Sequence, residues 1–440
     1  MKELYIKDLP FVTPIKGYME LFGWVKSKRR LKNKIFFDLV DSTGEVQIVV
    51  PKGVSNYDEL SGILPETAVK VKGEKIRRKN KIEILASDVK ILANSSLTIS
   101  PLPRSEFNVF DSKYSNQVLT NRHLYLRNEK ISAIIKFKSK FIFEMHRYFQ
   151  ENGFVFLEAP VLTKLLLYDD SSAFKLKWSD KEDVWLSQCC TFQLESAICS
   201  HEKVYNITPS FRAEKSRSNR HLREYTHLKV ELAWVDLKDL IKFAEDSIYT
   251  FSKNTIINSE KELEILGIDF NPDIFKPPYE RTTYDDAVDF LHSKGKEFKW
   301  GKSLSTSDEM MLTEEFGDKL LWVEGIPCSA EGFPFKRNRD NLKLTRTCDL
   351  ISSNGFGELL GTAEKITDEK ELLIRMKEKG KTTKEQLKRY QWYVDLRKFG
   401  LPPHGGIGMG VERVIRFILK VPHVRDVMSF PRLYGRNPNP

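Results

Sequence analysis

The chain has 440 residues, 40% of them hydrophobic and 30% charged, which is the composition of a soluble globular protein and a length that predicts two or three domains. Lysine and arginine exceed aspartate and glutamate by 71 to 61, a net charge of +10 that permits a polyanionic partner without requiring one. Five cysteines without a CxxC pair exclude a disulfide framework and a zinc pattern, and the lack of a signal sequence or long apolar run predicts a cytoplasmic protein without membrane association.

Residues 1–94 contain short runs rich in β-branched and aromatic residues, such as "KIFFDLVDSTGEVQIVV", separated by turn signals. Several such strands in fewer than 100 residues predict a small barrel, of which the five-stranded oligonucleotide-binding fold is one candidate. Residues 95–125 include "NSSLTISPLPRSEF", a stretch with two prolines and no apolar period, and are expected to form a hinge.

Residues 126–440 begin with apolar residues at helical spacing from about 129 to Gly153, followed by a strand in "VFLEAPVL". Further strands are expected at 184–188, 203–212 and 225–235, a helix at 236–253, and helices alternating with loops over 254–330. The chain then closes with two strands and a glycine turn before a helix. Strands and helices without regular βαβ alternation predict an α+β domain with a mixed, mainly antiparallel sheet.

The stretch "FRAEKSRSNRHLREYTHLKVELAW", 211–234, concentrates charge between two predicted strands. Arg212 and Glu214 share one strand face, Arg220 and His221 lie in the polar loop, and Tyr225 begins the return strand. Because a guanidinium grips phosphate in bidentate fashion and a tyrosine ring stacks on a base, this pattern indicates an ATP site without a P-loop. The alternative is an exposed charged hairpin.

Two later segments add chemistry. "CDLISSNGFGELLG" supplies Asp349 and Glu358, which on adjacent strands would hold Mg²⁺ between phosphates, although an ordinary acidic turn fits equally. "GGIGMGVERVIRF" lacks the βαβ context of a dinucleotide fingerprint. Its glycines would admit a flat ligand and Arg413 would stack on it; the alternative is a tight turn with a surface arginine.

In this order, these segments resemble the class II aminoacyl-tRNA synthetases. Residues 141–160 resemble the first signature motif, which forms the dimer interface, the charged hairpin resembles the second, and "GIGMGVERVIRF" the third. The N-terminal barrel and "NRHLYLR" at 121–127 narrow the resemblance to the aspartate, asparagine and lysine subclass, and the hairpin with "QLESA" is more similar to asparaginyl enzymes. The resemblance implies an anticodon-binding domain at 1–94, a hinge at 95–125 and a catalytic domain at 126–440.

The resemblance also implies activation of asparagine with ATP and Mg²⁺ to an aminoacyl-adenylate, transfer to the 3' end of tRNA, and a homodimer. Arg212, Glu214 and Arg413 would be catalytic: Arg212 would bridge the amino-acid carboxylate and the α-phosphate, Glu214 would contact the adenine amino group, and Arg413 would sandwich adenine with Tyr225. The implied ATP site comprises Arg212, Glu214, Arg220, His221, Leu222, Tyr225, Glu358, Gly410, Glu412 and Arg413. The implied amino-acid site comprises Thr191, Glu195, Arg212, Gly361, Lys365 and His404, the metal site Asp349 and Glu358, and the anticodon-reading set Arg29, Phe36, Gln47 and Glu83.

Several positions depart from the pattern of asparaginyl enzymes. Thr191 stands where a glutamine binds the substrate amino group, Lys365 replaces an arginine that contacts the substrate side chain, and Lys229 replaces an acid on the second motif. The segment around 164–173 lacks the glutamate and glycines of the family's loop. Two alternatives follow: a paralogue that adenylates another amino acid or uses another acceptor, and a non-catalytic tRNA-binding or regulatory protein. A binding protein would not need Arg212, Glu358 and Arg413.

Overall fold

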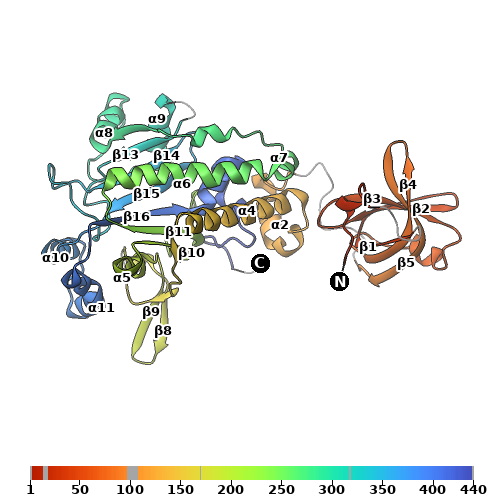
Figure 1. Cartoon of the computed structure of the whole chain (residues 1–440), viewed down its shortest axis with the longest axis horizontal. Helices are drawn as coiled ribbons and strands as arrows, with labels where there is room; N and C mark the ends of the chain where they lie inside the picture. The colour runs from red at the N-terminus through yellow and green to blue at the C-terminus, as the bar shows by residue number, and fades with distance from the viewer. Residues whose placement is uncertain (1, 13–17, 97–107, 169, 317–318, 439–440) are drawn as a thin grey trace. The chain divides into compact units, whose positions relative to one another are not determined.

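The computed structural model describes residues 2–12, 18–96, 108–168, 170–316 and 319–438 of the chain. The chain divides into two compact units, Met1–Phe107 and Asn108–Pro440, which are considered separately (Figure 1). None of the described helices is both long enough and apolar enough to cross a membrane.

The N-terminal unit is a closed barrel with the strand order β1-β2-β3-β5-β4, which confirms the predicted oligonucleotide-binding fold. Its apolar side chains alternate along each strand as one-sided burial requires: Val69 and Val71 of β4 are fully buried, and lysines stand between and after them. The strands are β1 (Met19–Leu31), β2 (Lys34–Val40), β3 (Glu45–Pro51), β4 (Ala68–Arg78) and β5 (Lys81–Ala93), and the short helix α1 spans Tyr57–Ser61.

The second unit is built on an eight-stranded sheet with the order β12-β13-β14-β15-β16-β11-β10-β6. Only its two edge pairs, β12 with β13 and β6 with β10, are parallel, so the prediction of a mainly antiparallel sheet is confirmed. The strands are β6 (Val155–Phe156), β10 (Lys203–Phe211), β11 (Glu224–Ala233), β12 (Glu280–Thr283), β13 (Leu321–Glu324), β14 (Thr347–Ser352), β15 (Gly357–Glu364) and β16 (His404–Gly410).

Three helices pack on one face of this sheet and form the main core (Figure 1). The first, α4 (Glu129–Glu151), starts where the Asn128 side chain accepts hydrogen bonds from the Lys130 and Ile131 amides, which is a typical N-cap. The others are α6 (Leu237–Ile257) and α12 (Val411–Leu419). Leu228, Val230 and Leu232 of β11 point into this core, so the alternating residues of β11 face the opposite side of the sheet.

The remaining elements surround this layer. A small sheet has the order β7-β9-β8, with β7 (Leu162–Thr163), β8 (Lys175–Ser179) and β9 (Glu182–Leu186). The strand expected in "VFLEAPVL" is split into β6 and β7, because Pro160 between them has no amide to donate to a ladder. The other helices are α2 (Ser115–Thr120), α3 (Arg122–Tyr125), α5 (Thr191–His201), α7 (Glu260–Leu266), α8 (Tyr284–Ser293), α9 (Thr306–Phe316), α10 (Glu369–Glu378) and α11 (Lys384–Asp395). Residues 97–107 of the expected hinge and residue 169 of the 164–173 segment lie outside the described residues.

Candidate active site

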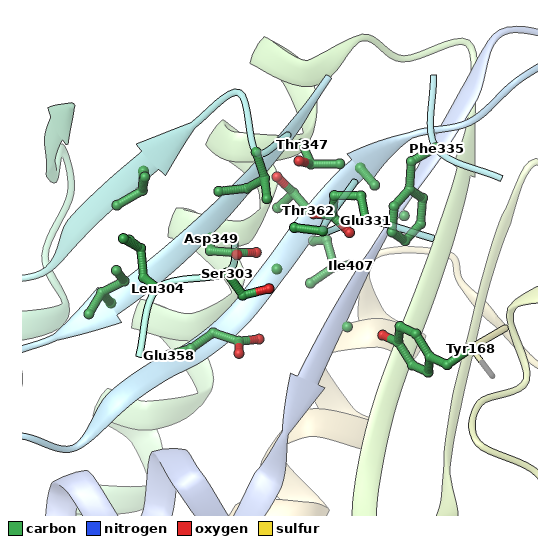
Figure 2. A pocket seen from close by; sticks show the side chains of 18 of the residues that line it. Tyr168, Ser303, Leu304, Glu331, Phe335, Thr347, Asp349, Glu358, Thr362 and Ile407 are labelled. Atoms are coloured by element: carbon green, nitrogen blue, oxygen red, sulfur yellow. The ribbon is translucent and has the colours of Figure 1, made fainter. Parts of the chain in front are cut away.

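A cavity of about 490 Å³ opens on the sheet face opposite the three helices, and the predicted catalytic residues Arg212, Glu214 and Arg413 line it. Figure 2 shows other residues of its lining, among them Asp349 and Glu358. The strand register arranges its floor in rows. One row runs from Asp349 through Gly361 and Gly408 to Lys229, and the next runs from Thr347 through Ala363 and Gly406 to Glu231. The register of the strands therefore decides which side chains lie side by side on the cavity floor.

The floor is formed by glycines because larger residues would fill the space. A Cβ atom at Gly408 would lie 2.5 Å from Nζ of Lys229, and one at Gly361 would lie 2.8 Å from Oδ1 of Asp349. At Gly406 a Cβ would meet the backbone oxygen of Val230 at 2.4 Å. Glycine thus lets a flat ligand approach the backbone here, as the sequence predicted for the Gly-rich strand.

Arg212, at the end of β10, lines the cavity between two aromatic rings. Its guanidinium carbon lies 5.2 Å from the ring centre of Tyr168 and 5.7 Å from that of Tyr225, and Nη1 lies 3.8 Å from the Glu214 carboxylate. Its pKa is raised, chiefly by Tyr225. The predicted hairpin residues Arg212, Glu214 and Tyr225 therefore meet, although Tyr225 stands behind the arginine rather than in the cavity lining.

Arg220 and His221 also line the cavity, but their partners were not predicted. Arg220 forms an ion pair with the buried Glu309 of α9. His221 shares a hydrogen bond of 3.1 Å with the Ser216 hydroxyl, and burial followed by the charge of Arg413 lowers its pKa to about 4. Burial raises the pKa of Glu309 to about 7. At neutral pH, His221 can therefore offer a phosphate a neutral hydrogen bond and no positive charge.

Glu358 and Arg413 form an ion pair of 2.9 Å at the cavity wall, and Asp349 lies nearby on β14 (Figure 2). Burial and the charge of Glu358 raise the pKa of Asp349 well above its usual range. Two carboxyl groups that repel each other in a buried site are stabilised by a cation, and Mg²⁺ needs only one or two protein carboxylates beside phosphate oxygens. Asp349 and Glu358 fit that ion, although the described residues contain no cluster of three or more metal-binding side chains.

The deep end of the cavity is a buried ionic cluster. Oε2 of Glu195 accepts hydrogen bonds from Tyr393 at 2.6 Å and Arg397 at 3.0 Å, and lies 3.3 Å from Nε2 of His404. Burial alone would raise the pKa of Glu195, but these neighbours and Lys365 lower it. Glu195 and His404 thus lie beneath the cavity rather than in its lining.

Lys365 and Thr191, the two altered positions of the amino-acid site, contact each other. Nζ of Lys365 donates a hydrogen bond of 3.0 Å to the Thr191 hydroxyl and lies 3.8 Å from Oε1 of Glu195. Both residues line the cavity, together with Gly361. The Lys365 ammonium therefore uses the Thr191 hydroxyl as an acceptor, and the two altered positions lie in direct contact.

Lys229 and Glu231 face the cavity from alternating positions of β11. Burial lowers the pKa of Lys229, and burial raises the pKa of Glu231 to about 7. The sequence marked Lys229 as unusual but gave no role to Glu231, Glu309, Glu331 or Tyr168, all of which line the cavity. The period-two pattern of β11 contained the signal for Glu231, whereas the other three come from separate segments.

Four residues expected in the ATP site lie outside the cavity lining: Tyr225, already described, and Leu222, Gly410 and Glu412. Leu222 is buried, and Gly410 is the N-cap residue of α12. Glu412 is 1% exposed and binds the Thr226 amide at 3.0 Å and Nζ of Lys138 at 2.6 Å. Because Lys138 and the β11 backbone satisfy this carboxylate, Glu412 connects α4, α12 and the sheet instead of facing a ligand.

The four predicted anticodon residues are adjacent on the barrel. Arg29 pairs with Phe36 across β1 and β2, with its guanidinium carbon 5.3 Å from the ring centre, and Gln47 pairs with Glu83 across β3 and β5. In the amide orientation that satisfies both neighbours, Gln47 accepts from Arg29 at 2.9 Å and donates to Glu83 at 3.2 Å. The strands thus gather one polar patch with an arginine-covered ring, which can accept a stacked base once the arginine moves.

Comparison with known proteins gives a consistent result. Residues 115–434 match the family described as tRNA synthetases class II (D, K and N), and residues 20–92 match the OB-fold nucleic acid binding domain. The asparagine–tRNA ligase of Pyrococcus furiosus is 35% identical over 425 residues, covering 95% of each chain. The asparaginyl-tRNA synthetase of Pyrococcus horikoshii, solved with asparaginyl-adenylate, is 33% identical with a TM-score of 0.89 and covers 99% of each chain. The Entamoeba histolytica asparaginyl-tRNA synthetase, also solved with asparaginyl-adenylate, is 27% identical with a TM-score of 0.83, covering 96% of this chain and 97% of that one.

Proposed function

The chain belongs to the class II tRNA synthetases (D, K and N), and on that premise we propose that it activates asparagine with ATP and transfers the asparaginyl group to the 3' end of tRNA. The observation that carries this proposal is the cavity that places Arg212, Arg413, Glu358 and Asp349 around a glycine floor. Relatives that are named asparagine–tRNA ligases cover nearly the whole chain, which supports the choice of substrate.

In the proposed reaction, the carboxylate of asparagine attacks the α-phosphorus of ATP and pyrophosphate leaves. Arg212 binds both the carboxylate and the α-phosphate, and it stabilises the charge that builds up on the phosphate oxygens. Held between Tyr168 and Tyr225, its guanidinium is oriented before the substrates bind, which is the main protein contribution to such a displacement. Arg413 stacks on adenine while its ion pair with Glu358 fixes its position.

We assign the triphosphate to the wall formed by Arg220, His221, Asp349 and Glu358. Mg²⁺ bound to Asp349 and Glu358 would neutralise phosphate charge there. Arg220 must exchange its Glu309 partner for the γ-phosphate, and the raised pKa of Glu309, about 7, eases that exchange because part of the Glu309 population is neutral at pH 7. Neutral His221 supports the same phosphate by hydrogen bonding.

The remaining assignments concern the rest of the chain. We propose that Arg29, Phe36, Gln47 and Glu83 read the anticodon, with domain limits at 94 and 126, and that the protein works in the cytoplasm. We also propose a homodimer through the 141–160 segment. Phe143, Val155 and Phe156 of this segment are 63%, 41% and 36% exposed, and these apolar side chains are ones that a second copy would cover.

A paralogue that adenylates a different acid is the second candidate, because specific residues favour it. By the family resemblance, Lys365, Thr191 and Lys229 replace the residue types that asparaginyl enzymes use around their amino acid, and the hydrogen bond between Lys365 and Thr191 supports this candidate. A lysine ammonium does not reproduce the two-point contact of an arginine. This candidate predicts adenylation of an acid other than asparagine.

Aminoacylation of total tRNA with labelled asparagine tests the proposed function. The enzyme, ATP and Mg²⁺ should transfer label to tRNA, and periodate oxidation of the tRNA 3' end should abolish the transfer. Transfer of another amino acid to tRNA, without transfer of asparagine, would favour the second candidate. No transfer of any amino acid would refute the tRNA acceptor.

A further inference from the structure

The charged side chains of the cavity are distributed unevenly around the place where the α-ammonium group of the substrate would lie. The proposed function fixes the substrate carboxylate near Arg212, and the deep cluster around Lys365 and Thr191 receives the substrate side chain. The α-ammonium group must then point toward one end of the floor rows, either β11 or β14. The β11 end carries Lys229 and Glu231, whereas the β14 end carries Asp349 and Glu331.

Lys229 closes the β11 end at the level of Gly408. A Cβ on Gly408 would lie 2.5 Å from its Nζ, so the lysine ammonium extends over the floor. In the described part of the chain no carboxylate forms an ion pair with Lys229. An α-ammonium at the level of Gly408 would lie against the Lys229 ammonium, which is unfavourable in a partly dehydrated pocket.

Glu331 lies at the other end. It comes from the loop between β13 and β14 and projects over the floor between Asp349 and Phe335 (Figure 2). Hydrogen bonding from the Thr347 side chain and the Gly332 amide partly opposes the rise that burial causes in the pKa of Glu331, and Thr347 lies at the β14 end of the Thr347–Ala363–Gly406 row. Among the residues that the structure describes, Glu331 forms no ion pair within 4.0 Å. Burial raises the pKa of its carboxyl group, and the more distant charge of Lys379 opposes that rise, so a ligand cation close to the carboxylate would stabilise its charged form.

A metal ion is a poor explanation for this carboxylate. The described residues contain no group of three or more side chains that could hold a metal, so Glu331 does not complete a chelate with Asp349 and Glu358. Glu331 is partly exposed, and a cation beside its carboxylate would offset the cost of its partial burial; the amino-acid substrate of the proposed reaction brings one ammonium group.

We propose that Glu331 is a specificity-determining residue of this site that binds the α-ammonium group of the substrate amino acid, an inference that rests on the proposed adenylation. Glu331 would replace the anchors that Thr191 and Lys229 no longer supply. It would also select α-amino acids over carboxylic acids that carry hydrogen or a hydroxyl group on the α-carbon.

The test is a binding cycle with two non-hydrolysable analogues of asparaginyl-adenylate, in which a sulfamoyl group replaces the phosphate. One analogue keeps the α-amino group and the other carries hydrogen there. Calorimetric Kd values should show that the wild type prefers the amino analogue by about 10- to 100-fold, the usual effect of a charged hydrogen bond. Glu331→Gln should bind the two analogues within threefold of each other and keep the wild-type Kd for the deamino analogue.

The matched control is Glu231→Gln, which removes the acid at the opposite end of the row and should keep the wild-type preference. Glu331→Asp, with its carboxylate withdrawn by one methylene, should give an intermediate ratio and guards against misfolding of the glutamine variant. Three results with the variants overturn the proposal: a wild-type ratio of Kd values in Glu331→Gln, equal weakening of both analogues in that variant, or a lost preference in Glu231→Gln. A wild type that binds both analogues equally, or binds neither, also overturns it. A wild type that shows the ratio but adenylates no asparagine refutes the proposed function alone.

Discussion

Replacement of Arg212 should lower the catalytic activity far more than it lowers the folding stability. In Arg212→Ala, the preoriented donor at the α-phosphate is lost, and loss of one such donor lowers kcat by about 10²- to 10³-fold, or about 2.7–4 kcal/mol. Arg212 also bridges the reacting carboxylate, so the alanine variant should fall below detection in ATP–pyrophosphate exchange. Arg212→Lys keeps the charge without the bidentate geometry and should retain at most about 1% of the activity.

The same change should barely affect folding. Arg212 contributes two ring contacts, each worth about 0.5–1 kcal/mol, and a 3.8 Å pair with a half-exposed Glu214 worth about 0–1 kcal/mol. The expected loss of about 1–3 kcal/mol lowers Tm by only a few degrees. Exchange at saturating asparagine and a calorimetric melt measure the two effects. An Arg212→Ala protein with activity within tenfold of the wild type would refute the assigned role, and a collapsed melt would make the loss structural.

Three further changes test other parts of the account. Phe36→Ala should leave exchange intact and raise KM for tRNA by about 5- to 150-fold, the value of one stacked base at about 1–3 kcal/mol; loss of exchange would show that the barrel had been assigned the wrong task. Gly406→Ala should destabilise the fold by about 1–3 kcal/mol, because its methyl group would lie 2.4 Å from a backbone oxygen. In Gly408→Ala the methyl group would lie closest to the end of the flexible Lys229 side chain, so this variant should keep its Tm but raise KM for the amino acid at least tenfold. Equal melting temperatures for the two variants would contradict this contrast. Burial raises the pKa of Glu231 to about 7, so its contribution to stability is present below about pH 4.5 and is lost as pH rises toward 7. Glu231→Gln should therefore have the unfolding free energy of the wild type near pH 4.5 and exceed it at pH 8 by up to about 3 kcal/mol. The same difference between the two proteins at both pH values would argue against a titrating Glu231.

The sequence was sufficient to predict elements whose pattern is local. The run of residues at 225–235 predicted the strand β11, and the helical spacing after 129 predicted α4. Arg212 and Glu214 could be placed together for the same reason. The two-layer fold followed from the order of these elements and from the family resemblance.

Long-range pairing accounts for what was missed. Glu412 looked like a ligand-binding residue beside Arg413, but Lys138, far away in the sequence, neutralises it inside the fold. Glu309 and Glu331 come from segments between 254 and 345, where neither periodicity nor motif indicates a cavity. Only the register of β14, β15 and β16 brings those segments over the same floor as β11.

ATP–pyrophosphate exchange by the wild-type enzyme, measured against each of the twenty amino acids, tests the central claim most directly. The account predicts ATP- and Mg²⁺-dependent exchange with asparagine that exceeds exchange with every other amino acid. Exchange driven by a different amino acid, with none for asparagine, would contradict the proposed substrate and would support the candidate in which the pocket around Lys365 binds that other amino acid. Absence of exchange with all twenty, in the presence of tRNA as well, would contradict adenylation itself.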